Sequence, residues 1–235
     1  MSLLIKLKAE TLSLKNPQKA KILSNFFKTG KGEYGEGDIF YGINVPQSRK
    51  IAVKYSSLPL SQVKKLLQSK IHEERLISLL ILVHNHNKNK DKRNEIIKFY
   101  LANTNKINSW DLVDLTADKI LGSHLLNKDK SLLYKLARSS NLWEKRISII
   151  STFYFIKNNQ FGETLSISKL LLKDKHDLIQ KAVGWMLREI GKRSLSTLEG
   201  FLKDNYKEMS RTTLRYAIEK FPEDKRKAYL KERFK

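Results

Sequence analysis

The fold is decided by a short motif, Glu73-Glu74-Arg75-Leu76-Ile77-Ser78-Leu79, which returns further along the chain as Glu144-Lys145-Arg146-Ile147-Ser148-Ile149. Looser copies occur at residues 180–184 and 211–215. The copies are offset by about 35 residues or by twice that, which is the scale of two-helix repeats. Such repeats bury their apolar faces against their neighbours and stack into a curved array with a concave face. The sequence therefore predicts an all-α superhelix, a solenoid of paired helices.

Apolar residues elsewhere recur at three- and four-residue spacing, as in Leu76, Leu79, Leu80 and Val83. No segment has the alternating pattern typical of a strand. Polar breaks divide the chain into about a dozen helices, and we predict one domain over residues 1–235. The expected breaks are Asn16-Pro17, Pro46, Pro59-Leu60-Ser61, Asn85 to Asp91, Gly122-Ser123, Ser139-Ser140-Asn141, Asn158-Asn159, Lys173-Asp174 and Pro222.

One longer non-helical excursion is expected between Gly30 and Gly42, which holds five of the ten glycines. Glycine permits backbone angles and close approaches that other residues do not. The acids of this segment, Glu33, Glu36 and Asp38, do not have the spacing of a calcium loop.

The charge balance indicates a polyanionic partner. Lysine and arginine number 46 against 24 acids, which gives a formal net charge of +22. There are no cysteines, and the five histidines have no ligand spacing, so we expect neither a metal nor another cofactor. No run reaches membrane-spanning length, and residues 1–15 alternate Leu with Lys and Glu where a leader would have an unbroken apolar core and a cleavage site, so we expect a cytoplasmic protein.

Residues 108–114 read Asn-Ser-Trp-Asp-Leu-Val-Asp. On a helix, the four-residue spacing places Trp110 and Asp114 on one face. Tryptophan alone is usually a buried aromatic residue, but a carboxylate beside it in so basic a chain repels the phosphates that the other charges attract. This pair is therefore a candidate for chemistry. Asp111 lies about 100° away round the helix and is expected to cap it or to face solvent.

Four segments resemble the AlkD-type DNA alkylation repair proteins, the HEAT-like-repeat DNA glycosylases. They are residues 16–20 (NPQKA), 109–114 (SWDLVD), 141–146 (NLWEKR) and 179–189 (IQKAVGWMLRE), and they occur in the family's order. The Trp-Asp pair and the Gly-Trp-Met-Leu-Arg-Glu run make the resemblance specific. It implies a single HEAT-like-repeat domain with a concave basic groove.

The resemblance also implies an activity in base excision repair: hydrolysis of the N-glycosidic bond of cationic N3- or N7-alkylated purines in duplex DNA, without base flipping. Asp114 matches the aspartate that stabilises the developing oxocarbenium ion and positions water. Trp110 and Trp185 match the tryptophans that pack against the sugar at the lesion. Because the alkylated purine already carries positive charge, it leaves readily, and one carboxylate can suffice.

The same resemblance assigns DNA contacts. Arg146 matches a phosphate-binding arginine of the family. Phe27 stands where a characterised family type has a tyrosine, so the hydroxyl is lost and only ring stacking is possible there. Arg188 lies one turn beyond Trp185. The predicted DNA-binding residues are Arg146, Arg188, Lys181, Lys192, Arg193, Arg75 and Phe27.

Other interpretations remain open at this point. Arg146 is also consistent with an ordinary solvated charge, and Trp143 is expected to pack between helices. The protein is expected to act as a monomer on double-stranded DNA, associated with the nucleoid when bound. The alternative function is a non-catalytic HEAT-like-repeat scaffold that binds bent or branched DNA through charge and shape. An RNA- or protein-binding helical solenoid is a third possibility. Asp114 separates the enzyme from the scaffold, because a scaffold needs no carboxylate beside tryptophan on its binding face.

Overall fold

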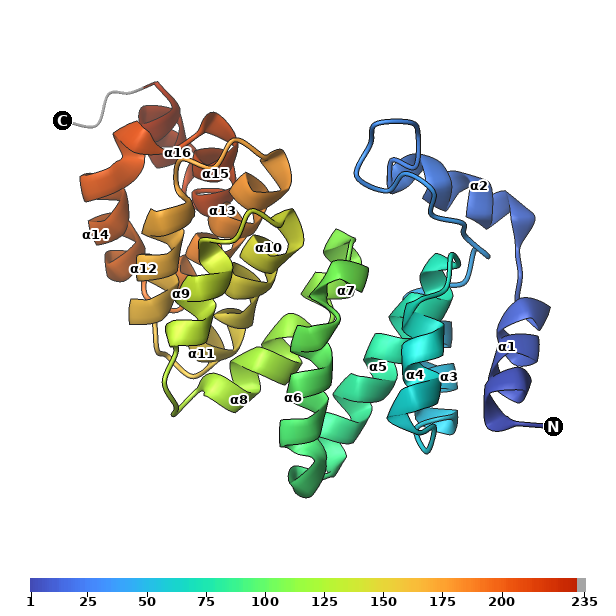
Figure 1. Cartoon of the computed structure of the whole chain (residues 1–235). Helices are drawn as coiled ribbons and strands as arrows, with labels where there is room; N and C mark the ends of the chain where they lie inside the picture. Colours follow the sequence, from blue (N-terminus) through green and yellow to red (C-terminus); the bar gives the residue numbers. More distant parts are fainter. Residues whose placement is uncertain (232–235) are drawn as a thin grey trace. The chain divides into compact units, whose positions relative to one another are not determined.

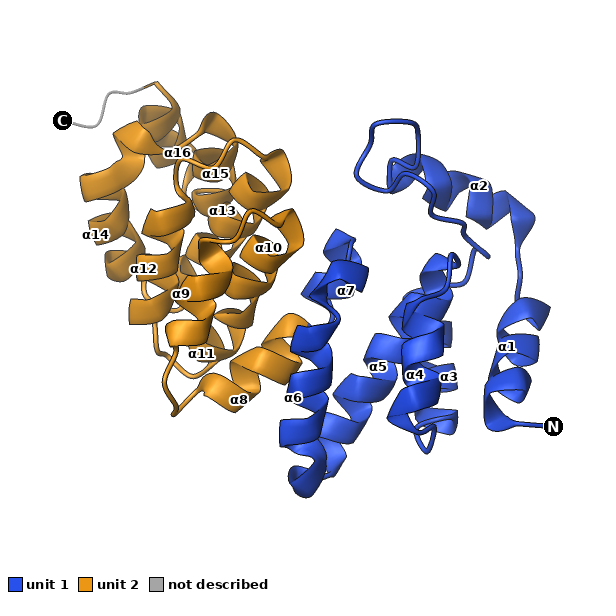
Figure 2. Cartoon of the chain, in the orientation of Figure 1, with its two compact units in different colours: residues 1–116 blue, residues 117–235 orange. Residues whose placement is uncertain are grey.

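The computed structural model describes residues 1–231, so the last four residues of the predicted domain 1–235 lie outside it. The described chain is helical, and its only β-type pairing is an isolated parallel bridge between Ile39 and Ile71 (Figure 1). The predicted all-α fold is therefore confirmed. No described helix is both long enough and apolar enough to cross a membrane. The chain divides into two compact units, residues 1–116 and residues 117–235 (Figure 2).

Unit 1 is built around one long helix, α5. The helices of unit 1 are α1 (Leu3–Ser13), α2 (Pro17–Phe26), α3 (Val45–Lys54), α4 (Leu60–Leu67), α5 (His72–Lys88), α6 (Arg93–Ala102) and α7 (Trp110–Asp114), with 3-10 turns at Lys90–Lys92 and Thr104–Lys106. Helix α5 is buried on every side from His72 to Val83, as expected of a helix that forms the centre of a core. Helices α3 and α4 pack against it.

Unit 2 is built around α13. Its elements are a π-helical turn (Asp118–Gly122), α8 (Ser123–Leu125), α9 (Ser131–Ala137), α10 (Leu142–Ser151), α11 (Phe153–Lys157), α12 (Gly162–Leu171), α13 (Asp177–Gly191), α14 (Leu195–Asn205), a 3-10 turn (Tyr206–Glu208), α15 (Arg211–Ala217) and α16 (Glu223–Leu230). Helix α13 packs against α10, α12, α14 and α15. It buries Ile179, Val183, Met186 and Ile190 along one face, so the apolar stripe of the sequence becomes the centre of this unit.

Most of the predicted breaks are helix ends. Asn16 caps α2 by accepting a hydrogen bond from the Lys19 N–H at 2.9 Å, and Asn141 accepts one from the Trp143 N–H at 2.8 Å. Pro59 and Pro222 occupy the N-cap positions of α4 and α16.

Two predicted breaks are wrong. At Gly122-Ser123 the π-helical turn continues directly into α8. A Cβ on Gly122 would lie 2.2 Å from the carbonyl oxygen of Ser151, so this glycine permits close helix packing and does not end a helix. The predicted loop from Asn85 is helical as far as Lys88. Tertiary contacts hold this end: the Asn85 side chain donates to the Ser56 carbonyl at 2.8 Å, and His86 is buried.

The glycine-rich segment is non-helical, as predicted, and joins Phe26 to Val45. Gly42 has a φ of +84°, and a Cβ there would lie 2.3 Å from the carbonyl oxygen of Asn16. Only glycine fits both requirements. The segment is thereby held against the start of α2.

Candidate functional site

Helix α7 is a single turn whose ends are the two residues singled out by the sequence. It begins at Trp110 and ends at Asp114, and both side chains are half-buried. Because one turn separates residues i and i+4, the predicted placement of indole and carboxylate on one helix face follows directly. Helix α7 packs against α5, so the position of the pair depends on the contacts between these two helices.

Trp110 ends a column of stacked rings within unit 1. Its indole lies parallel to Phe27, with centroids 5.0 Å apart and an interplanar angle of 6°. Phe27 stacks on Phe40 at 5.0 Å, and Phe40 stacks on His72 at 4.5 Å. Phe26 meets Trp110 edge-on at 5.8 Å. Parallel and edge-on contacts of this kind fix ring orientation, so the plane of the Trp110 indole is set by its neighbours.

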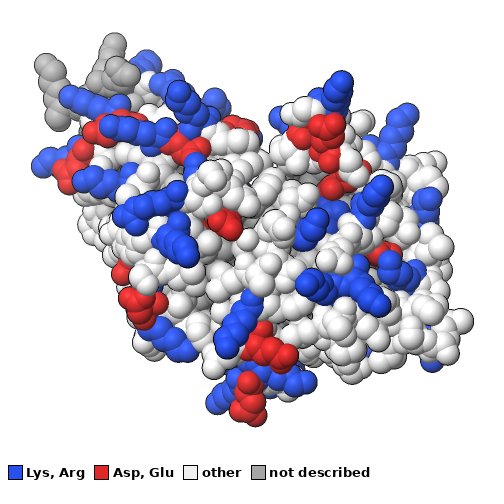
Figure 3. Space-filling model, in the orientation of Figure 1, with Lys and Arg blue, Asp and Glu red and all other residues white. Residues whose placement is uncertain are grey.

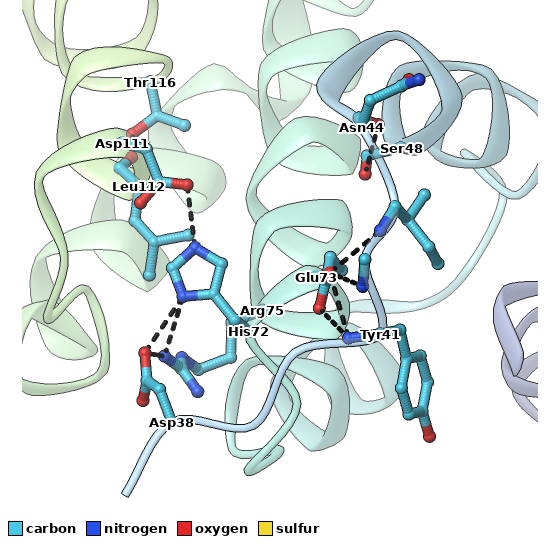
Figure 4. A network of polar contacts seen from close by, with 12 residues as sticks. Asp38, Tyr41, Asn44, Ser48, His72, Glu73, Arg75, Asp111, Leu112 and Thr116 are labelled. Atoms are coloured by element: carbon cyan, nitrogen blue, oxygen red, sulfur yellow. Dashed lines mark hydrogen bonds and ion pairs between the residues drawn. The ribbon is translucent and has the colours of Figure 1, made fainter. Parts of the chain in front are cut away.

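The far end of this column is a buried polar network (Figure 4). The His72 ring bridges two carboxylates, with Nε2 at 2.8 Å from Asp111 Oδ2 and Nδ1 at 3.0 Å from Asp38 Oδ2. Arg75 Nη2 donates to the same Asp38 oxygen at 2.5 Å. The four side chains are each less than 10% exposed. The network therefore ties α5, α7 and the glycine-rich segment together at one imidazole.

The charges of this network balance when His72 is protonated. Burial alone would lower the pKa of His72, but the charge and hydrogen bond of Asp111, together with the hydrogen bond of Asp38, outweigh burial and raise the pKa to about 9. Burial likewise raises the pKa of Asp38, yet its contacts with His72 and Arg75 hold that pKa below the usual value. Both ring nitrogens of an imidazolium donate, which matches an acceptor oxygen on each side.

A second contact holds the glycine-rich segment to α5. The Glu73 carboxylate accepts hydrogen bonds from the backbone N–H groups of Tyr41, Gly42 and Ile43 at 2.8 to 3.1 Å (Figure 4). A cavity of about 360 Å³ lies beside these groups, lined by residues of α2, the glycine-rich segment, α5 and Asp111. The segment thus forms part of the wall around the network.

The expectation that Asp111 caps α7 or faces solvent was wrong. The residue is 6% exposed and bonds to His72, because α7 packs on α5 through the side of the helix that Asp111 occupies. The network as a whole was not predicted. His72 and Asp111 are 39 residues apart, and nothing in their local sequence shows that they meet. The one local clue is that His72 directly precedes the motif at Glu73.

Unit 2 carries the other predicted tryptophan. Trp185 is half-buried on α13, and its ring lies 5.7 Å from Phe153 at an angle of 52°. Its indole also hydrogen-bonds to the Glu189 carboxylate one turn on. Trp143 is buried at the start of α10, as expected of a residue that packs between helices.

The predicted DNA-binding cations mostly have partners already. Arg146 is 5% exposed, and its Nη1 donates to the Leu178 carbonyl at 2.5 Å. Arg75 bonds to Asp38, and Phe27 is 7% exposed within the ring column. The remaining contacts join Lys181 to Asp177, Arg188 to Glu219, and both Lys192 and Arg193 to Glu189.

The Glu189 contacts perturb its titration. Burial raises the pKa of this carboxyl, but hydrogen bonds from Lys192, Arg193 and Trp185 outweigh burial and hold the pKa below its usual value. Glu189 therefore stays ionised and competes with phosphate for these cations. Among residues 1–231, no three or more His, Cys, Asp or Glu side chains are grouped so as to hold a metal ion.

Comparison with known families identifies the chain. The sequence profile of a family described as DNA alkylation repair enzyme matches residues 7–221. The chain belongs to this family. Solved structures of similar fold include a predicted DNA alkylation repair enzyme from Enterococcus faecalis, at 18% identity and a TM-score of 0.67, with 89% of this chain and 97% of that chain covered.

AlkD2 from Streptococcus mutans aligns at 20% identity and a TM-score of 0.59, with coverage of 88% of this chain and 98% of that one. A third structure, smu.31 from Streptococcus mutans, aligns at 21% identity and a TM-score of 0.55, with coverage of 94% and 99%. At these identities the likeness shows the shared helical-repeat fold. No curated protein matches the sequence.

Proposed function

We propose that this member of the DNA alkylation repair enzyme family is a DNA glycosylase of base excision repair. Its substrate is duplex DNA that contains a cationic N3- or N7-alkylated purine, and its reaction is hydrolysis of the N-glycosidic bond without base flipping. The observation that carries the proposal is the single turn of α7, which places Trp110 and Asp114 together at half-buried positions.

The chemistry needs little from the protein beyond this pair. The bond between C1′ and the purine nitrogen breaks, and its electrons neutralise the positive charge of the departing base. The positive charge that develops on the sugar is stabilised by the carboxylate of Asp114 in a sheltered position. The same carboxylate accepts a hydrogen bond from the attacking water. The water oxygen bonds to C1′, and the proton released ends in solvent.

The surroundings of α7 support this role. A group that stabilises a transition state must be held in place before the reaction begins. Trp110 is held by the stacked Phe27 ring, and Asp111, three residues before Asp114, is held by His72. We assign to Trp110 the contact with the sugar at the lesion, where an indole face favours a cationic ring. Trp185 is proposed as the second such indole.

The proposed phosphate contacts differ in availability. Lys181, Lys192 and Arg193 are partly exposed and need only exchange a carboxylate for a phosphate. Arg188 must likewise release Glu219. Arg146 is buried, so phosphate binding there requires either that its side chain move or that a phosphate reach its buried N–H groups.

The test is release of free methylated purine from methylated duplex DNA by the wild type and by Asp114→Asn. Removing one electrostatic stabiliser of a transition state costs about 10²- to 10³-fold in rate, so we expect a loss of that size with the fold and DNA affinity retained. The matched control is Asp204→Asn, which removes an exposed carboxylate on α14 and should leave excision unchanged.

Two results would contradict the proposal in different ways. Full excision by Asp114→Asn would remove Asp114 from the mechanism while leaving a glycosylase. No excision by the wild type, with tight salt-sensitive duplex binding, would favour the alternative, a non-catalytic scaffold for bent or branched DNA.

A further inference from the structure

The cavity beside the buried network of unit 1 has the size and lining of a small-molecule site. Its volume is about 360 Å³, and sites for small organic ligands begin at about 300 Å³. Phe27 and Phe40 supply aromatic wall, and aliphatic side chains of α2, α3 and α5 supply much of the rest. A lining of this kind, with a few polar groups, suits a compact ligand with a largely apolar body.

One carboxylate oxygen at this cavity is buried without a hydrogen bond. Asp111 lines the cavity, and its side chain is only 9% exposed. Its Oδ2 bonds to His72 at 2.8 Å, whereas its Oδ1 accepts no hydrogen bond from the described residues (Figure 4). A buried charged acceptor is costly to leave without a donor. This oxygen therefore favours a ligand that brings an N–H or O–H group.

The charged groups at the cavity do not favour an anion. On the face shown in Figure 3, Lys and Arg side chains outnumber Asp and Glu. The cavity instead combines two carboxylates, Asp111 and Glu73, with protonated His72 and with Lys19 at its exposed rim. Because these charges balance, the cavity has no excess of positive charge to attract a phosphate. We therefore expect an uncharged ligand.

The exposed rim of the cavity offers hydrogen-bond donors. Lys19 and Asn44 both line the cavity and are both exposed. The Lys19 ammonium only donates. The side-chain carbonyl of Asn44 already accepts a hydrogen bond from the Gln47 N–H at 2.9 Å, so its NH2 group is the part that suits a ligand. A ligand that matches the whole cavity carries a donor for Asp111 and an acceptor for the rim.

We propose that this cavity binds a free purine base, with an N–H group of the base donating to Asp111 Oδ1. A purine is flat and uncharged, and proteins bind it through its apolar faces and through the donors and acceptors on its edge. These are the features that the wall, the buried oxygen and the rim of the cavity match.

The proposed reaction supplies such a ligand. Phe27 lines the cavity and also stacks on Trp110 at 5.0 Å, so one ring contacts both the cavity and the residue proposed to meet the sugar. The inference rests on the proposed function in taking the released alkylated base as the ligand. The base enters after its bond to the sugar has broken, so no nucleotide has to be flipped.

The test is isothermal titration calorimetry of the full-length protein with free 3-methyladenine, in the absence of DNA. For so small a ligand we expect a Kd on the order of 0.1 mM in the wild type. In Asp111→Asn, the new carbonyl oxygen stays with His72 and the NH2 group replaces the acceptor, so binding should weaken by about tenfold or more. No binding to the wild type at about 1 mM base would overturn the proposal.

A second variant tests the cavity without altering the polar network. Val45 lines the cavity from a half-buried position on α3, so Val45→Phe should fill part of it and abolish binding. The matched control is Val53→Phe, at an exposed position of the same helix that does not line the cavity; it should bind 3-methyladenine like the wild type. Equal affinities for these two variants, each with a normal melting temperature, would contradict the proposal.

A change in the ligand tests the hydrogen bond itself. The analogue 6-dimethylamino-9-methylpurine keeps the flat ring system but has no N–H group. Its affinity for the wild type should be lower than that of 3-methyladenine by about tenfold or more. If the analogue binds as tightly, the cavity recognises only apolar surface and the inference is wrong.

The result can be separated from that of the glycosylase assay. Asp114 does not line the cavity, so Asp114→Asn should lose excision and still bind 3-methyladenine like the wild type. If the wild type binds the free base but releases no methylated purine from DNA, the glycosylase proposal fails and the purine site stands. If it releases methylated purine but binds no free base, the purine site is wrong and the glycosylase proposal stands.

Discussion

Raising the pH from 6 to 9 should weaken unit 1 through a single residue, His72. The folded pKa of this histidine is about 9, against an ordinary value of 6.5. A group whose pKa is raised by folding contributes stability that is complete below the unfolded pKa and disappears as the pH rises through the folded pKa. The loss should therefore fall between pH 6.5 and 9.

The size of the effect follows from the same two values. Each pH unit between them is worth about 1.4 kcal/mol, so deprotonation should reduce the free energy of unfolding by about 3 kcal/mol. Above pH 9, His72 is neutral, only one of its two nitrogens donates, and one buried carboxylate loses its hydrogen bond.

Urea unfolding at pH 6, 7.5 and 9, followed by tryptophan fluorescence, measures this loss. Replacing Trp143 and Trp185 by phenylalanine leaves Trp110 as the only tryptophan, so the signal reports on unit 1. In this background His72→Gln should have a lower free energy of unfolding at pH 6 than its parent, and that free energy should lack the loss of about 3 kcal/mol between pH 6 and 9. His84→Gln, a half-buried histidine of the same helix, is the matched control and should decline like the parent. If the free energy of unfolding falls equally between pH 6 and 9 with and without His72, the reasoning is refuted.

Two further predictions concern unit 2. Arg146→Ala removes the side-chain donor to the Leu178 carbonyl and should lower the free energy of unfolding, measured with urea, by about 1–3 kcal/mol. If Arg146 also binds phosphate, the slope of log duplex affinity against log salt should become shallower by about one. An unchanged slope would restrict the residue to a structural role. Trp185→Ala should reduce single-turnover excision more than duplex affinity. If its only effect is a lower melting temperature, Trp185 belongs to the core of α13, and Trp185→Phe, which keeps a ring beside Phe153, should then behave as the wild type.

The positions of the helices were predictable because they depend on the spacing of residues that are close together in the sequence. The three- and four-residue periodicity of α5 and α13 and the caps at Asn16 and Asn141 depend on residues within a few positions of one another. The errors arose where contacts between residues far apart in the sequence determine whether a helix ends. Gly122 looks like a helix end in sequence, but it is packed against Ser151, and the polar stretch after Asn85 stays helical because of Ser56.

The candidate site likewise has one part that could be predicted from local spacing and one part that could not. The placement of Trp110 and Asp114 on one face of α7 was predictable because four residues make about one helical turn. The buried network behind them was not found, because Asp38, His72 and Asp111 come from three separate segments whose meeting depends on how α5 and α7 pack. A single sequence indicates which residues share a helix face, but it does not indicate which faces meet.

The repeated arginine of the opening motif also has a structural explanation. In both clear copies the arginine is buried and donates to a backbone carbonyl of another segment: Arg75 to Ser69, and Arg146 to Leu178. The motif therefore joins adjoining segments as well as placing charge. In the last copy Thr213 precedes Leu214, where the two clear copies have arginine and the copy at residues 180–184 has Lys181 before an apolar residue. Terminal repeats are commonly atypical because fewer neighbours follow them. The arginines of that copy stand at other positions, and one of them, Arg215, makes no such bond within the described residues.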